Sequence, residues 1–211
     1  MKKHSQEMMC IVEHLMIQTS PVLVGVKPSV LTGICDTERC HGINFLDLWE
    51  KEKENIINDL GLSCRELKTT LRGKQLLFFD PDELKRTLMI RDNAEFLKRF
   101  GYFSCVSEKD YLDELKVRFN GRNFPHEIGV FLGYPLKDIK GFIYRESKPL
   151  AALSRWRIFG DPTGSLKLME LHKQVESVFK QLMDKGKDPM RFLDKLTMYF
   201  QDKNEFSSIS V

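Results

Sequence analysis

The stretch ELKTTLRGKQLLFF, residues 66–79, decides the fold class because it reads as two strands joined by a turn at Arg72 and Gly73. The pattern predicts a hairpin, although its turn is not of the Asn-Gly or Asp-Gly type. Asp80, Pro81 and Glu83 follow directly and provide an N-cap, a proline at the first helical position and an acidic residue in the first turn. We therefore expect a hairpin followed by a helix from about residue 81 to 90.

Apolar residues at helical spacing recur on both sides of this hairpin. They predict helices at about 5–17, 44–60, 107–119, 165–184 and 189–200. Further strands are predicted at 21–28, PVLVGVKP, and at 154–159, SRWRIF, with a loop at 32–43. Helices outnumber strands, and the strands are too irregularly spaced for a regular βαβ series. Residues 1–211 are thus predicted to form a single, mostly helical α+β domain with a small sheet.

The composition is that of a globular protein. Of the 211 residues, 42% are hydrophobic and 30% are charged, and the net charge of +3 is too small to indicate a nucleic-acid or membrane surface. No window approaches the roughly 18 apolar residues of a membrane span, and the amino terminus lacks the apolar stretch of a secretory signal. We expect a cytoplasmic protein that binds neither nucleic acid nor membrane.

Five cysteines, an odd number, indicate reduced thiols and not a disulfide framework. Cys35, Cys40 and His41 form a C-x4-C-H pattern that resembles half of a metal site. No second Cys/His pair follows at the spacing of a zinc ribbon or finger. The sequence therefore predicts no metal and no other cofactor.

The most unusual segment is FPHEIGVFLGYPLKDIKGFI, residues 124–143. It places His126 and Glu127 directly after a proline and contains three glycines, a density that is common around sites. Its apolar residues fit two helices separated by a turn at 133–135. Alternation over residues 126–134 also fits a strand that begins at His126. The helix-turn-helix alternative is favoured because the helical spacing continues through the second half.

This segment resembles the hallmark sequence FPHEIGxFLGYPxxDVxGFI of an uncharacterised family of small cytoplasmic proteins from anaerobic bacteria, a domain of unknown function. PVLVGVKPSVL, GKQLLFF and RWRIFGD extend the resemblance more loosely, in the family's order, over most of the chain. The resemblance implies membership and no particular activity. Relatives often carry a cysteine where this chain has Thr19, so a mechanism that uses that thiol does not transfer.

A weaker resemblance connects the chain to papain-like cysteine acyltransferases and peptidases, in which a cysteine, a histidine and an Asp or Asn follow in that order. HEIGVFLGYP followed by RWRIFGDP is similar to the later part of that order. The resemblance implies Cys35 as nucleophile, with Cys40 as the alternative, His126 as base and Asp161 as the residue that orients it. The predicted function is then acyl transfer through a thioester, on a small-molecule or carrier-bound acyl substrate.

The alternative function is a non-catalytic protein that binds a small ligand in a pocket around His126 and Glu127. These two residues begin like the H-E-x-x-H motif of metalloproteases, but Val130 stands at the position of the second histidine. GDPTGSLK, residues 160–167, lacks the full pattern of a phosphate-binding loop. The two hypotheses differ in whether a cysteine sulfur lies within reach of the His126 ring.

Overall fold

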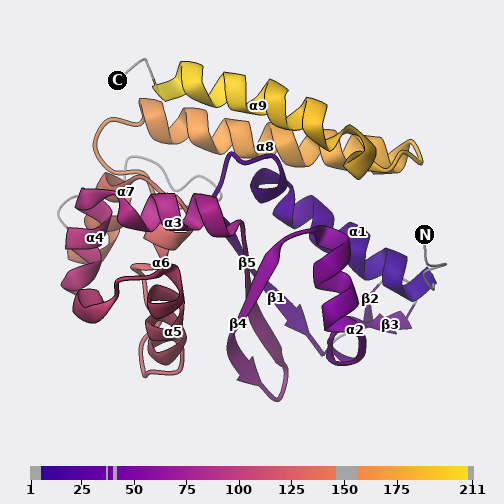
Figure 1. Ribbon diagram of the computed structural model, residues 1–211, viewed down its shortest axis with the longest axis horizontal. Coiled ribbons are helices and arrows are strands. Elements are labelled where there is room, and N and C mark those ends of the chain that lie inside the picture. The colour runs from indigo at the N-terminus through magenta and orange to yellow at the C-terminus, as the bar shows by residue number, and fades with distance from the viewer. Residues whose placement is uncertain (1–5, 37, 40–41, 146–155, 209–211) are drawn as a thin grey trace.

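A three-stranded antiparallel sheet lies at the centre of the computed structural model, which describes residues 6–36, 38–39, 42–145 and 156–208. The strand order is β1 (Ser29–Cys35), β5 (Gly73–Phe79) and β4 (Ser63–Thr70), so β5 pairs on both sides (Figure 1). The hairpin predicted at 66–79 is confirmed as β4 and β5. Two short strands, β2 (Glu38–Arg39) and β3 (Ile43–Asn44), form a separate ribbon.

The central strand explains why the chain has two hydrophobic cores. Leu76 and Phe78 point into one core, whereas Leu77 and Phe79 point into the other. Successive side chains of a strand face opposite sides, so a continuous apolar run is stable only when both faces of the sheet are covered. Each face of this sheet therefore has its own layer of helices.

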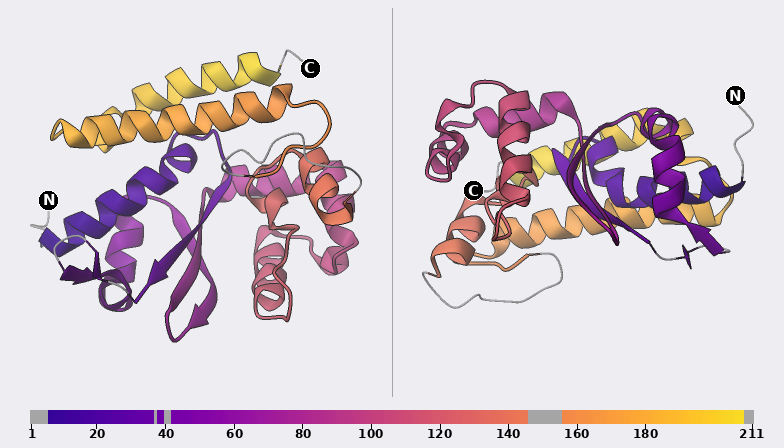
Figure 2. Two further views of the ribbon diagram at one scale, coloured as in Figure 1. Left: turned by 180° about the vertical axis from the view of Figure 1, so that it is seen from behind. Right: turned by 90° about the horizontal axis from the view of Figure 1, so that it is seen from below.

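Four helices build the first core: α1 (Gln6–Leu23), α2 (Phe45–Leu60), α8 (Thr163–Asp184) and α9 (Leu193–Ser208). Helices α1 and α2 pack beside the sheet, and α8 and α9 lie over α1 as a long antiparallel pair (Figures 1 and 2). The short helix η3 (Pro189–Phe192) connects that pair. Trp49, Phe78, Phe179 and Phe200 are the large, fully buried aromatic residues of this core.

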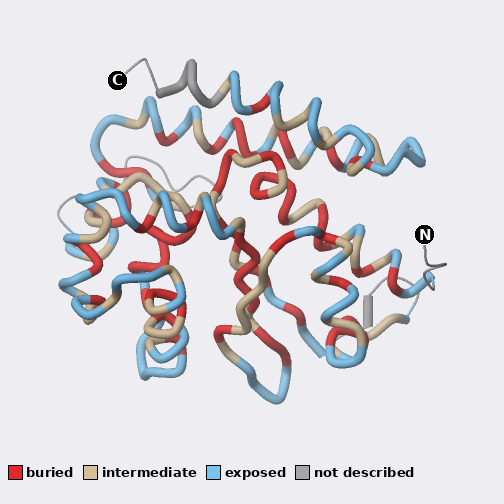
Figure 3. The backbone as a smooth tube through the Cα atoms, in the orientation of Figure 1, coloured by how far each residue is buried: buried red, intermediate tan, exposed pale blue. Residues whose placement is uncertain are grey.

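Shorter helices build the second core on the opposite face. They are α3 (Pro81–Met89), α4 (Arg91–Lys98), η2 (Tyr102–Ser104), α5 (Glu108–Phe119), α6 (Ile128–Phe131) and α7 (Leu136–Tyr144). Burial is greatest where these layers meet the sheet and decreases toward the tip of the β4–β5 hairpin (Figure 3). The predicted α+β class, with a small sheet in a mostly helical chain, is confirmed.

Local capping explains why several predicted helices are found where expected. Asn44 accepts hydrogen bonds from the backbone at the start of α2, and Gly61 ends that helix with a left-handed φ of 65°. Asp80 caps α3, with Pro81 at the first helical position. Ser107 forms a capping box at the start of α5.

The strand predicted at 21–28 is wrong, because α1 continues to Leu23 and β1 begins only at Ser29. Pro21 lacks the N–H that would bond the Ile17 carbonyl, and the Ser20 hydroxyl donates to that carbonyl instead, at 2.8 Å. The loop predicted at 32–43 is also partly wrong, because its first four residues belong to β1.

The strand predicted at 154–159 is not formed over residues 156–159, the part that the structure describes; only Ile158 makes an isolated bridge there. The backbone N–H of Phe159 donates to the carboxylate of Asp138, at 2.9 Å. A side chain has thus taken the place of a neighbouring strand as the hydrogen-bond partner.

Candidate functional site

The segment 124–143 forms a helix-turn-helix, as the favoured alternative predicted. Helices α6 and α7 are joined by a turn in which Gly133 has a φ of 70°. A side chain at Gly133 would also collide with the ring of Pro28, since its Cβ would lie 2.6 Å from Pro28 Cδ. The strand alternative for 126–134 is therefore wrong, and with it the papain-like resemblance loses the strand that should carry its histidine.

Glu127 is buried and neutralised inside the second core. Its side chain is 2% exposed, and Arg118 Nε donates a hydrogen bond to its Oε1. The Tyr102 hydroxyl donates to the same oxygen at 3.4 Å. Burial, followed by the Glu127 charge, raises the pKa of Tyr102 above its ordinary value. These contacts tie α6 to α5 and leave Glu127 inaccessible to a ligand.

His126 is exposed and packs between aromatic rings. Its ring centroid lies 5.4 Å from that of Phe124 and 4.9 Å from that of Phe142. Within the described ranges, neither ring nitrogen of His126 forms a hydrogen bond. The ring thus has aromatic contacts but no thiol or carboxylate partner among those residues.

Asp138 forms the most extensive polar network of the segment. One carboxylate oxygen accepts from Lys137 Nζ at 2.8 Å and from the Phe159 N–H at 2.9 Å. The other accepts from Trp156 Nε1 at 2.9 Å and from Ser165 Oγ at 2.6 Å. Burial alone raises a carboxyl pKa, but these four hydrogen bonds outweigh it and lower the pKa of Asp138. The network fastens α7 to the start of α8.

Ser165 and Lys137 resemble a catalytic pair by residue type and distance, since Lys137 Nζ lies 3.0 Å from Ser165 Oγ. Ser165 is fully buried, and its hydroxyl proton is donated to Asp138. Gly141 allows Phe159 to pack closely against α7, because a Cβ at Gly141 would lie 2.3 Å from the Phe159 ring. The segment therefore acts as a structural clasp between helices.

The three predicted triad residues have separate surroundings. Asp161 is exposed, and its Oδ1 accepts from the Thr163 backbone and hydroxyl at 3.1 and 2.8 Å, which lowers the pKa of Asp161. Cys35 is exposed at the end of β1, and Cys40 lies outside the described residues. No hydrogen bond within the described part of the chain connects Cys35, His126 and Asp161.

Cys35 lines a groove of about 450 Å³ between the end of the sheet and the chain after α5. The floor consists of two rows across the strands, because residues paired across a sheet point to the same face. One row is Gly33, Gln75 and Lys68, and the next is Cys35, Gly73 and Thr70. Each row contains a glycine, which has no side chain to fill the groove, so the floor stays open.

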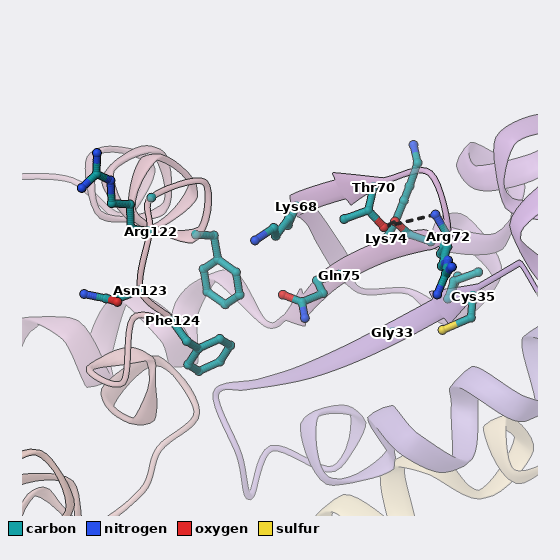
Figure 4. Close-up of a pocket in the computed structure, with 14 residues that line it drawn as sticks. Gly33, Cys35, Lys68, Thr70, Arg72, Lys74, Gln75, Arg122, Asn123 and Phe124 are labelled. Carbon is teal, nitrogen blue, oxygen red and sulfur yellow. Dashed lines mark hydrogen bonds between the residues drawn. The ribbon is translucent and has the colours of Figure 1, made fainter.

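The opposite wall is the end of α5 and the residues that follow it. Phe119 and Phe124 stand edge to face there, with ring centroids 5.2 Å apart. Asn120 Nδ2 donates to the Leu67 carbonyl at 3.1 Å and so holds this wall beside β4. In Figure 4, Cys35 and Phe124 lie on opposite sides of the groove. The thiol and the chain leading to His126 are therefore separated by the width of the groove.

The charged residues on the two faces of the hairpin differ in their partners. Lys74 points to the α2 side, where its ammonium lies 2.7 Å from Glu50 and 2.9 Å from Glu66. Lys68 and Arg72 line the groove, and neither has a carboxylate partner within the described ranges. Figure 4 shows Lys68 extending toward the wall that carries Phe124, with Arg72 at the Cys35 end.

Gln75 stands in the middle of the groove floor. Its Oε1 is buried and receives no hydrogen bond from any residue that the structure describes. An unpaired buried acceptor costs about 1–3 kcal/mol, so such groups are rare in folded proteins and mark places where a partner is missing. No sequence motif points to Gly33, Lys68 or Gln75, because only the strand register brings them into one row.

A second hollow, also of about 450 Å³, lies between residues 25–28 and helices α3, α4 and α6. It contains charged side chains of both signs, among them Lys27, Glu83 and Asp92. Lys27 is buried, with its ammonium 5.4 Å from the centre of the Tyr134 ring. Its mixed charges indicate no single ligand class.

Comparison with known proteins places the chain in a family. Residues 15–193 match the family described as "Protein of unknown function (DUF3793)". The chain belongs to the DUF3793 family. The expected membership of a family of unknown function is thus confirmed, and the DUF3793 match runs from α1 to the first residue of α9, through both cores. No curated protein and no solved structure matches the chain.

No helix in the described ranges combines the length and the apolar character needed to cross a bilayer. In the same ranges, no three His, Cys, Asp or Glu side chains are grouped so that they could hold a metal ion.

Proposed function

We propose that this protein is a non-catalytic binding protein whose groove takes a small ligand carrying a carboxylate or phosphate group. The observation that carries the proposal is the pair of cationic side chains, Lys68 and Arg72, that line the groove without a carboxylate partner among the described residues. The Lys74 ammonium, on the other face of the same hairpin, has two carboxylate partners. An anionic ligand would provide the missing partner on the groove side.

The surroundings strengthen such an interaction. Arg72 offers a planar guanidinium that can bind a carboxylate or phosphate through two hydrogen bonds. The apolar wall of Phe119 and Phe124 limits water on the side toward which Lys68 extends, which strengthens electrostatic attraction there, whereas Arg72 is exposed at the other end. The proposed pocket therefore lies next to Phe124, and His126 and Glu127 do not line it.

Acyl transfer through Cys35, His126 and Asp161 remains the alternative hypothesis and has less support. A cysteine nucleophile needs an imidazole within hydrogen-bond reach, and the imidazole needs a group that orients it. The ring contacts of His126 are with Phe124 and Phe142, and Asp161 is engaged by Thr163. Anion binding requires only the groups that already line the groove.

Isothermal titration calorimetry with inorganic phosphate and with succinate tests the proposal at low ionic strength. We expect saturable binding of at least one of these anions, which weakens as salt is added. Lys68→Ala and Arg72→Ala should each reduce the affinity. Arg99→Ala, which removes an exposed arginine at the end of α4, is the matched control and should leave it unchanged. Equal affinity in all four proteins would overturn the proposal.

A further inference from the structure

We infer that the ligand of the groove is a nucleoside phosphate whose base has an amino group beside a ring nitrogen, as adenine has. This inference rests on the proposed function, since it uses the same groove and the same two cations. It adds a class of ligand, which follows from three further features: an unpaired carboxamide, an aromatic wall and a floor opened by glycines.

The carboxamide of Gln75 selects the base. Its Oε1 is a buried acceptor without a donor among the described residues, so a ligand that donates to it removes an existing cost. Gln75 lines the groove, and the terminal torsion of glutamine is broad, so its carboxamide can turn to meet a ligand there. A carboxamide pairs with adenine through two hydrogen bonds, because it accepts from the amino group N6 and donates to the ring nitrogen N7.

The aromatic wall provides a surface for a flat ring. Phe124 is 46% exposed where it lines the groove, so part of its ring is accessible to a ligand. Stacking of a base on an aromatic side chain contributes about 1–3 kcal/mol and does not depend on which base is bound. Phe124 therefore accounts for affinity, and Gln75 accounts for the choice of base.

The groove has the arrangement that such a ligand needs. Gln75 lies between Phe124 and Arg72 in Figure 4, so a base at the phenylalanine wall can reach the carboxamide while its phosphate extends toward Arg72. Lys68 lies beside Gln75 in the strand register and extends toward the Phe124 wall, so it faces the base side of the ligand, whereas Arg72 faces the phosphate. Gly33, on the other side of Gln75, leaves open space on the floor. A volume of about 450 Å³ falls within the range of small-molecule sites.

Calorimetric titration with three related compounds tests the inference: AMP, IMP and ribose 5-phosphate. IMP differs from AMP at the base edge, where a carbonyl replaces the amino group, and ribose 5-phosphate lacks the base. We expect AMP to bind at least about tenfold more tightly than IMP, because IMP keeps the N7 acceptor but places a carbonyl oxygen, in place of the amino donor, opposite Gln75 Oε1. Ribose 5-phosphate should bind more weakly than AMP because it cannot stack.

Two variants test whether Gln75 selects the base and whether Phe124 stacks on it. Gln75→Leu should remove the difference between AMP and IMP while leaving ribose 5-phosphate binding unchanged. Phe124→Ala should weaken AMP and IMP alike, whereas Phe103→Ala, which truncates a phenylalanine that is 76% exposed outside the groove, should weaken neither. Circular dichroism and a thermal melt establish that each variant is folded. Since Phe124 lies in an exposed segment, its variant provides a test even where Gln75→Leu does not fold.

The outcomes separate the inference from the proposed function. Equal affinities for AMP, IMP and ribose 5-phosphate would overturn the inference, and the groove would remain a general anion site. Absence of binding by all three, together with absence of phosphate and succinate binding, would overturn both. A preference for AMP that persists in Gln75→Leu would also overturn the inference, because the selectivity would then arise elsewhere.

Discussion

The clasp of residues 124–143 and the groove at the end of the sheet both combine glycines with charged side chains, but they differ in whether the polar groups have partners. In the clasp, Glu127 is paired with Arg118, and the Asp138 carboxylate accepts four hydrogen bonds. In the groove, Lys68 and Arg72 have no carboxylate partner within the described ranges, and the Gln75 oxygen has no donor there.

This difference teaches that an unusual motif can serve packing, whereas a binding site is better recognised by groups whose partners are missing. Glycines illustrate the point. Gly133 and Gly141 allow other parts of the chain to approach closely, since a Cβ at either would collide with Pro28 or Phe159. At Gly33 a Cβ would meet only the Lys74 carbonyl oxygen, 3.9 Å away, so the absent side chain leaves room.

The largest expected effect is on the clasp. Asp138→Ala removes the acceptor of four hydrogen bonds, and the buried Phe159 N–H and Ser165 hydroxyl lose the carboxylate to which they donate. We expect the free energy of unfolding to fall by about 3–5 kcal/mol, as when one partner of a buried pair is removed. Urea denaturation measures this change. Asp161→Ala, at an exposed position, should cost less than about 1 kcal/mol, and an equal loss in both would contradict the assignment.

Close packing at Gly141 predicts the next effect. Gly141→Ala places a Cβ 2.3 Å from the ring of Phe159, and the forced displacement should cost about 1–3 kcal/mol of unfolding free energy. Gly164→Ala is the matched control, because it also lies in a helix but its Cβ would have no neighbour within 4 Å. There the higher helix propensity of alanine should make the change neutral or slightly stabilising. If the two variants have the same stability, the close approach at Gly141 has no energetic consequence.

Acid should weaken the clasp through Asp138. Because the pKa of Asp138 is lowered in the folded protein, its contribution to stability is fully present above the ordinary carboxyl pKa of about 3.9 and is lost as the pH falls through the folded value. We expect the unfolding free energy of the wild type to decrease with acidification below about pH 4 more steeply than that of Asp138→Asn. Equal slopes for the two proteins would mean that Asp138 is not the group responsible.

Thiol labelling tests whether Cys35, which lines the groove, reacts independently of His126. Cys35 is exposed, whereas burial and then the Glu66 charge raise the pKa of the Cys64 thiol. We expect iodoacetamide to modify Cys35 faster than Cys64 and His126→Ala to leave the Cys35 rate unchanged, as mass spectrometry of the labelled peptides can measure. A strong decrease of the Cys35 rate in His126→Ala would instead support the acyl-transfer hypothesis.

The smallest expected effect on stability is that of removing the cationic side chains of the groove. Lys68→Ala and Arg72→Ala remove no interaction with a carboxylate of the described residues, so each should change the unfolding free energy by less than about 0.5 kcal/mol. The same urea denaturation series measures this. A large loss in either variant would show that the cation supports the fold and is not held for a ligand.

The parts of the fold that depend on local signals could be predicted from the sequence. The caps at Asn44, Asp80 and Ser107 correctly predicted where three helices begin. The apolar run that ends at Phe79 correctly predicted the second strand of the hairpin. The strand predicted at 21–28 is wrong because the Ser20 hydroxyl replaces the hydrogen bond that Pro21 cannot donate, so the helix continues to Leu23. Nothing in the spacing of apolar residues reveals that substitution.

The candidate site could not be predicted, because it depends on which strands are neighbours. Gly33 is far in the sequence from Lys68 and Gln75, and the three residues form one row only through the order β1, β5, β4 and the register of its pairs. His126 and Glu127 were conspicuous for their motif, yet their surroundings are aromatic rings and a buried ion pair. Candidate residues of this kind can be assigned only once tertiary contacts are known.

The most direct test of the central claim, that the groove and not the clasp is the binding site, is a two-dimensional ¹H–¹⁵N NMR titration of the whole chain with inorganic phosphate. We predict saturable chemical-shift changes at the backbone amides of Gly33, Lys68, Gly73 and Gln75, with residues 126–143 unchanged. Shifts confined to residues 126–143, or no shifts at the groove at any phosphate concentration, would contradict it.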